Sequence, residues 1–191
     1  MIRRTGRTLA GLQLADILCR NWLVLLLRGL MAVGFGGWVF RTQLNAIVLP
    51  FCTYALADGV LGVGISIGEY TGDGRWWALF GWGLAGIGIG VLTFLSPSMN
   101  RLRLMCYIAL WAATTGVLVA MTAVFLRGKL GAEWLLVLAG LISVVFGISV
   151  VALSGTGPFM LSRMIAGYYV VFGIILGMLA LRARAVNLPA A

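Results

Sequence analysis

The sequence predicts an all-α membrane protein with six transmembrane helices packed in a single bundle. Apolar residues make up 62% of the 191 residues, against roughly 45–50% in soluble domains. Charged residues make up 10%, where a soluble domain carries about 25%. Six apolar stretches have the length that crosses a hydrocarbon core about 30 Å thick; they are Trp22–Phe40, Leu44–Ile67, Trp76–Leu95, Leu104–Leu126, Trp134–Leu153 and Met164–Leu181.

Residues 1–21 form a basic segment before the first apolar stretch. Arg20 interrupts the apolar run of residues 9–19, and no small-residue cleavage site follows Phe40, so residues 22–40 predict a retained span rather than a signal peptide. Leucines spaced among polar residues favour a short helix on the membrane surface, with a disordered tail as the alternative. The membrane domain then covers residues 22–184, and residues 185–191 form a tail.

The positive charges predict that both termini are cytoplasmic. With this orientation the external connections hold four basic residues, Arg41, Arg101, Arg103 and Arg163. The cytoplasmic segments hold nine, which is the bias expected of membrane proteins; they are Arg3, Arg4, Arg7, Arg20, Arg75, Arg127, Lys129, Arg182 and Arg184. This distribution accounts for the net charge of +9, so the charge does not indicate that the protein binds a nucleic acid. The expected partner is the lipid bilayer, and a second copy or another membrane protein is a further candidate.

The first, third and fifth stretches share a frame of small residues at offsets of 0, 3 and 7, which fall on one face of a helix. The frames are Gly29, Ala32 and Gly36; Gly83, Gly86 and Gly90; and Gly140, Ser143 and Gly147. Small residues let helix backbones approach closely in a bilayer, so we interpret the frames as packing surfaces. A glycine-lined pore or gate is the alternative.

The second, fourth and sixth stretches repeat as well. Each has a glycine at an interval of 57 residues, and an aromatic residue stands five positions before it. The glycines are Gly59, Gly116 and Gly173, and the aromatic residues are Tyr54, Trp111 and Tyr168. The chain is therefore predicted to contain three copies of one helical hairpin, at residues 22–70, 75–127 and 133–182.

Tryptophans mark the start of every odd-numbered stretch. They are Trp22, Trp76 (followed by Trp77) and Trp134. The amphipathic indole prefers the membrane–water interface, so these residues are predicted to anchor the helix ends there. Stacking on a ligand is the alternative.

Arg28 and Asp58 are charged residues within the apolar stretches. They are nearly equidistant from the first connection, Arg41–Asn45, so an antiparallel hairpin brings them to the same depth. That depth is about 9 Å into the hydrocarbon core for Arg28. Inserting either charge alone into the membrane costs about 2.5–3.5 kcal/mol or more. In the second and third repeats the positions equivalent to Arg28 and Asp58 hold uncharged residues, Trp82 with Thr115 and Ala139 with Phe172. Since both charges occur in one repeat and are missing from the others, we predict an ion pair.

Two interpretations of this pair remain open. It is either a salt bridge that fixes the first hairpin or a proton or ion site in which Asp58 is the coupling group. The chain has no histidine, and its cysteines, Cys19, Cys52 and Cys106, have no metal-binding or redox spacing. We therefore expect no enzyme, no catalytic residue, no metal and no cofactor, and we interpret the cysteines as small buried hydrophobic residues.

The segments Leu27–Leu30 and Tyr54–Gly59, together with the glycine frames and the three hairpins, resemble the HdeD-like family. The resemblance covers residues 20–184, and the arginine-bearing N-terminal segment departs from it. It implies six membrane helices in the bacterial inner membrane and a non-enzymatic role in acid-stress resistance, exerted through the membrane or a partner protein. The alternative function is a small transporter or channel for protons, ions or a solute.

Overall fold

A computed structural model describes residues 20–42, 46–68, 76–96, 101–125 and 133–187. In these ranges the protein is all-helical and has no strand. The six helices are α2 (Trp22–Arg41), α3 (Val48–Gly68), α4 (Trp76–Phe94), α5 (Arg101–Phe125), α6 (Glu133–Ala152) and α7 (Pro158–Asn187). The expected surface helix or tail in residues 1–21 falls almost wholly outside the described residues. Helix α7 continues past the predicted end of the membrane domain, as far as Asn187.

The two prolines within helices stand where a helix accepts them. Pro158 is the first residue of α7, where its missing N–H has no helical partner to lose. Pro50 is the third residue of α3, in the first turn. Neither proline interrupts a span, so the chain crosses the bundle as continuous helices.

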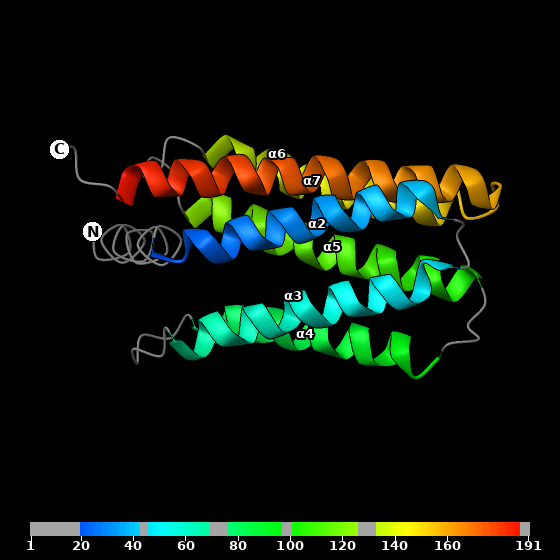
Figure 1. The fold of residues 1–191 in the computed structure, drawn as a ribbon, viewed down its shortest axis with the longest axis horizontal. Helices are drawn as coiled ribbons and strands as arrows, with labels where there is room; N and C mark the ends of the chain where they lie inside the picture. The colour runs from blue at the N-terminus through cyan, green and yellow to red at the C-terminus, as the bar shows by residue number, and fades with distance from the viewer. Residues whose placement is uncertain (1–19, 43–45, 69–75, 97–100, 126–132, 188–191) are drawn as a thin grey trace, which may run out of the picture.

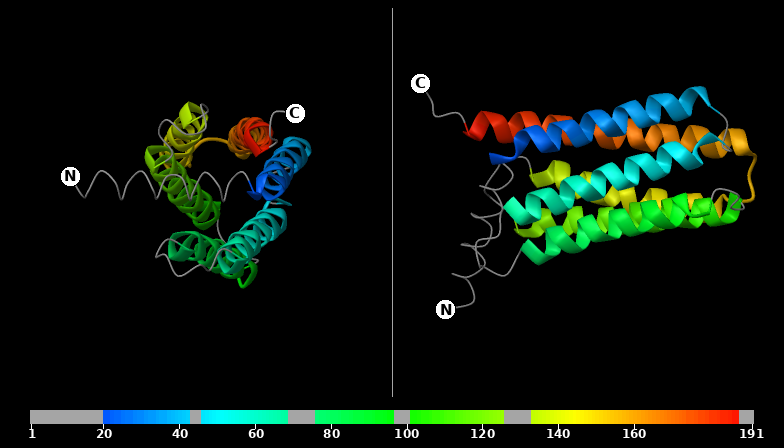
Figure 2. Two further views of the ribbon diagram at one scale, coloured as in Figure 1. Left: turned by 90° about the vertical axis from the view of Figure 1, so that its left-hand side faces the viewer. Right: turned by 60° about the horizontal axis from the view of Figure 1, so that its bottom comes forward.

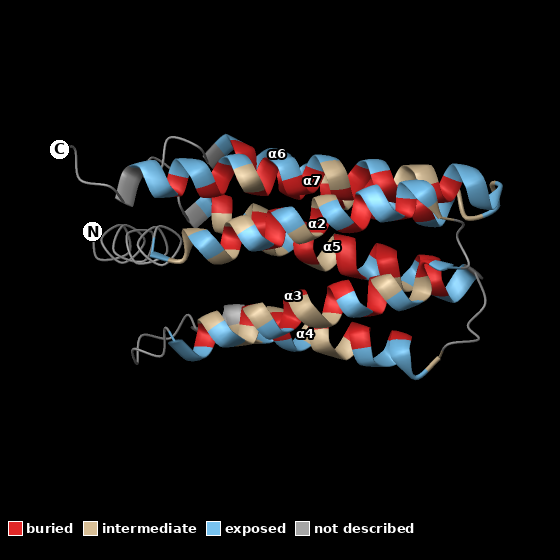
Figure 3. Ribbon diagram, in the orientation of Figure 1, coloured by how far each residue is buried: buried red, intermediate tan, exposed pale blue. Residues whose placement is uncertain are grey.

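The protein is a multi-pass membrane protein. Helices α2, α3, α5, α6 and α7 are each long and apolar enough to cross a bilayer, whereas the apolar stretch described in α4 is the shorter Phe80–Phe94. Five of the six predicted spans therefore reach the required length in the described part of the chain. Large apolar side chains are exposed on every helix; examples are Leu30, Val60, Leu84, Leu110, Leu141 and Ile174. Figure 3 shows exposed and buried positions alternating along the helices, as expected of helices with one face toward lipid.

The six helices form a ring in which each helix contacts two main neighbours (Figures 1 and 2). The tight pairs are α2 with α7, α3 with α4, and α5 with α6, and the end-on view in Figure 2 shows them at the corners of a triangle. Contacts between α2 and α3, α4 and α5, and α6 and α7 are sparser. The closest neighbours are thus not the two helices of each predicted hairpin. The last helix instead closes the ring on the first.

Glycines explain why three of the helix pairs are tight. A methyl group built on Gly59 of α3 would lie 2.7 Å from the carbonyl oxygen of Gly83 on α4, and 2.6 Å from the backbone nitrogen of Ile87. The same relation joins Gly116 to Gly140 between α5 and α6. Only a residue without a side chain permits such backbone contact, which is how membrane helices gain packing energy.

The third tight pair uses the same device between the first and last helices. A methyl group on Gly29 of α2 would lie 2.8 Å from the carbonyl oxygen of Gly173 on α7. The remaining glycines of the predicted frames also lie against a neighbouring helix: Gly36 against Ala166, Gly86 against Gly59, Gly90 against Leu56, and Gly147 against Ala109. The two frame positions that are not glycine, Ala32 and Ser143, are fully buried.

Aromatic side chains fill the inside of the ring. Phe35 of α2, Tyr54 of α3 and Tyr169 of α7 are in mutual contact, with ring centroids 4.6–5.3 Å apart. Tyr168 of α7 stacks on Phe146 of α6 at 3.9 Å and meets Tyr169 edge to face at 5.0 Å. All five are buried, so they join four helices around one apolar centre.

Candidate functional site

The polar site inside the bundle is built on the two charges of the first hairpin. Arg28 on α2 donates from Nε to Oδ1 of Asp58 on α3 at 2.6 Å, and from Nη2 to Oδ2 at 3.0 Å. Arg28 is 5% exposed and Asp58 2%. The two residues that the sequence placed at one depth are therefore in direct, two-point contact. Such bidentate charge-assisted bonds are among the strongest hydrogen bonds in proteins.

Trp82 of α4 covers the arginine. The Cζ atom of Arg28 lies 3.6 Å from the centroid of the Trp82 ring, close enough for a strong cation–π interaction. The guanidinium thereby joins α2, α3 and α4. The sequence pattern indicated Trp82 only as the counterpart of Arg28 in the next repeat and did not predict this contact. The available signal was an aromatic residue at the same depth on the adjoining helix.

Three buried tyrosines lie in the same bundle. Tyr54 stands one turn before Asp58 on α3, and its ring contacts Tyr169 of α7, which in turn contacts Tyr168. Tyr168 donates its hydroxyl to Oγ of Ser143 at 2.9 Å, and Ser143 donates in turn to the backbone oxygen of Ala139 at 2.8 Å. This chain of bonds ties α7 to α6. The sequence had pointed to Tyr54 and Tyr168 by their spacing, but not to Tyr169.

Replacing Tyr168 with phenylalanine is expected to reduce the free energy of unfolding by about 0.5–1.5 kcal/mol, the net value of one buried hydrogen bond. The ring stack on Phe146 stays, and Ser143 keeps its bond to its own helix. Thermal unfolding in detergent micelles measures the change. If Tyr168→Phe changes the free energy of unfolding by the same amount in the wild-type and Ser143→Ala backgrounds, the bond between the two hydroxyl groups contributes nothing to stability.

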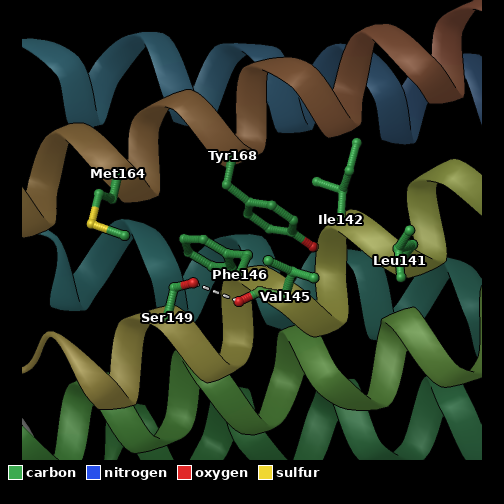
Figure 4. A pocket seen from close by; sticks show the side chains of 7 residues that line it. All are labelled: Leu141, Ile142, Val145, Phe146, Ser149, Met164 and Tyr168. Atoms are coloured by element: carbon green, nitrogen blue, oxygen red, sulfur yellow. Dashed lines mark hydrogen bonds between the residues drawn. The ribbon is translucent and has the colours of Figure 1, made fainter.

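An apolar groove lies between α6 and α7, with a volume of about 380 Å³ (Figure 4). Its polar lining groups, Ser149 and Tyr168, both have partners. Ser149 donates to the backbone oxygen of Val145 at 2.8 Å, and Tyr168 donates to Ser143. The remaining lining is Leu141, Ile142, Val145, Phe146 and Met164. The groove therefore offers an apolar surface and no activated nucleophile.

The helix ends carry arginine–aromatic contacts. Trp22 lies beneath Arg184, whose Cζ is 4.9 Å from the indole centroid. At the opposite end of the same helix pair, Arg163 lies 3.8 Å above the ring of Phe40. Trp134 is 63% exposed at the start of α6, as an interfacial side chain would be. The side chain of Trp76 falls outside the described residues.

The two described cysteines differ from each other. Cys52 is buried between α3 and α4, and its thiol lies 3.2 Å from the backbone oxygen of Gly90, to which it donates. Cys106 is exposed on α5, so the expectation that it is buried is wrong. On a membrane-spanning helix an apolar thiol is as compatible with lipid as with protein, which is why hydropathy does not distinguish the two environments.

Comparison of the chain with protein-family models, with curated proteins and with solved structures found no match. The resemblance to HdeD-like proteins therefore rests on the residues that carry it.

Proposed function

We propose that the protein is a non-enzymatic component of the bacterial inner membrane that contributes to acid-stress resistance. It acts through the bilayer or a partner membrane protein, as the resemblance to HdeD-like proteins implies. The observation that supports this is the two-point Arg28–Asp58 bond. Both carboxylate oxygens already accept a hydrogen bond from a buried arginine, which suits a fixed structural link.

The ion pair is proposed to fix the ring where its helices are least tightly packed. Helices α2 and α3 have sparse contacts, yet Arg28 joins them and extends to Trp82 on α4. A buried pair with good geometry offsets its own desolvation, whereas one buried charge without its partner is strongly destabilising. The pair therefore specifies one arrangement of α2, α3 and α4.

The finer architecture belongs to the same proposal. We infer three copies of one helical hairpin with both termini in the cytoplasm. The support is that Gly59, Gly116 and Gly173, which are 57 residues apart, each meet a glycine of the small-residue frame on the adjoining helix. The greater number of basic residues in the segments on the side of the termini supports the orientation.

Acid survival tests the proposed function. Cells that lack the protein are expected to survive an acid challenge less well than cells that express it at matched density. The variant Arg28→Leu/Asp58→Leu, expressed at the same level, is expected to restore survival, because the pair acts through the fold and not through its charge. Equal survival with and without the protein would contradict the proposed role.

A transporter or channel with Asp58 as coupling group is the second candidate. The observation that favours it is that three buried polar atoms inside the bundle have no partner among the described residues: Nε1 of Trp82, Oγ1 of Thr115 and the hydroxyl of Tyr169. Reconstitution in liposomes loaded with a pH-sensitive dye tests it. A proton flux that folded Asp58→Asn protein lacks would favour transport, and equal flux in both would exclude Asp58 as the coupling group.

A further inference from the structure

Two buried polar groups, one on α4 and one on α5, take no part in the hydrogen bonds of the ion pair. The indole N–H of Trp82 and the hydroxyl of Thr115 have no hydrogen-bond partner within the described part of the chain. Thr115 is only 3% exposed. Buried polar groups in native proteins are nearly always satisfied, either by protein or by ordered water.

Thr115 uses its hydroxyl differently from other hydroxyl residues in these helices. Thr93, Thr122 and Ser143 each donate to the backbone oxygen four residues earlier in their own helix, at 2.7–2.8 Å. That oxygen is within reach of any helical threonine. The hydroxyl of Thr115 does not make this bond, so it is directed elsewhere.

Trp82 and Thr115 lie at a similar depth in the bundle, on the neighbouring helices α4 and α5. One turn before Thr115, the ring of Trp111 comes within 3.0 Å of a methyl group built on Gly86, which is one turn after Trp82. Because α4 and α5 are consecutive and antiparallel, this contact brings Trp82 to the depth of Thr115. Over their whole length α4 and α5 have sparser contacts than the glycine-lined pair α3–α4.

We propose that Trp82 and Thr115 together bind a water molecule between α4 and α5, at the depth of the ion pair. The indole N–H can only donate, whereas the hydroxyl can donate and accept. The ligand must therefore accept a hydrogen bond from the indole N–H of Trp82. It must also donate a hydrogen bond to the hydroxyl of Thr115 or accept one from it. Water satisfies both groups, and a buried water needs two to four polar partners.

The charges nearby favour a neutral ligand. The Arg28 guanidinium lies against the face of the Trp82 ring at 3.6 Å, and it repels a cation from that side. Asp58 already neutralises Arg28 with both of its oxygens, so no net positive charge remains to hold an anion. The site thus gives the ion pair a hydrated neighbour on its α4 side. This inference does not depend on the proposed role in acid stress.

Solid-state NMR of the full chain in lipid tests the proposal. The wild-type protein is expected to show magnetisation transfer from water to the indole N–H of Trp82, a signal assigned by its loss in Trp82→Phe. Thr115→Val is expected to abolish the transfer and to lower the unfolding temperature by about 2–4 °C, because a bound water loses a partner. Thr122→Val is the matched control, since the Thr122 hydroxyl on the same helix donates to the backbone oxygen of Leu118, and it should leave the transfer intact.

Two results would overturn the proposal. If wild-type protein shows no transfer from water to the indole N–H of Trp82, no water is bound there and the proposal fails. If the transfer is present but persists unchanged in folded Thr115→Val protein, Thr115 is not a ligand of that water. The wild-type measurement remains decisive even if the valine variant fails to fold.

Discussion

Replacement of Asp58 with asparagine is expected to lower the free energy of unfolding by about 3–5 kcal/mol, the usual effect of removing one partner of a buried ion pair. Arg28 would remain 5% exposed, with its charge facing an amide instead of a carboxylate. The cation–π contact with Trp82 survives the change but cannot neutralise the charge. Thermal unfolding in detergent micelles or lipid nanodiscs measures the loss.

Thr53→Val is the matched control for this experiment. Thr53 lies on the same helix, is exposed, and donates its hydroxyl to the backbone oxygen of Leu49 at 3.0 Å. We expect this variant to unfold within about 0.5 kcal/mol of wild type, as surface substitutions usually do. If Asp58→Asn changes stability as little as Thr53→Val, the pair does not hold the bundle together.

Replacement of Gly59 with alanine has the second large expected effect. Its Cβ would lie 2.6 Å from the backbone nitrogen of Ile87 and 2.7 Å from the carbonyl oxygen of Gly83. Backbone atoms cannot rotate away, so α3 and α4 must separate. Overpacking of this kind costs about 1–3 kcal/mol or more, although alanine itself favours the helix by about 1 kcal/mol. A lower unfolding temperature is therefore expected.

Gly64→Ala on the same helix is the matched control. Apart from the two adjacent residues and the backbone of its own helix turn, nothing lies within 4 Å of a Cβ built at Gly64. Only the helix propensity changes there, so this variant should be as stable as wild type or slightly more stable. If the two alanine variants have the same stability, close approach at Gly59 is not what holds α3 to α4.

Arg28 and Asp58 show what sequence reasoning can predict for this molecule. Each stands about the same number of residues from the first connection, and antiparallel neighbours at equal distances from a connection share one depth. A charge is too costly in the hydrocarbon core to stay without a partner. The shared depth and the free-energy cost of an unpaired charge were therefore enough to predict which two side chains meet. They gave no information on the contact between Arg28 and the ring of Trp82.

The glycine frames show where sequence reasoning stops. A small residue at helical spacing indicates that another backbone comes close, but not which one. Gly29 illustrates this, because its neighbour is Gly173, near the other end of the chain. The closing contact between α2 and α7 depends on the geometry of all six helices, and no local pattern records it. The same holds for Tyr169, whose burial depends on two helices that are distant in sequence.

A double-mutant cycle on Arg28→Leu and Asp58→Leu tests the central claim most directly. In this account the two charges stabilise each other inside a largely apolar ring. Unfolding of the two single variants and the double variant gives their coupling free energy. We predict that each single variant is strongly destabilised and that the double variant regains most of the loss, because no buried charge is left unpaired. A double variant as unstable as the sum of the two single changes would contradict the account.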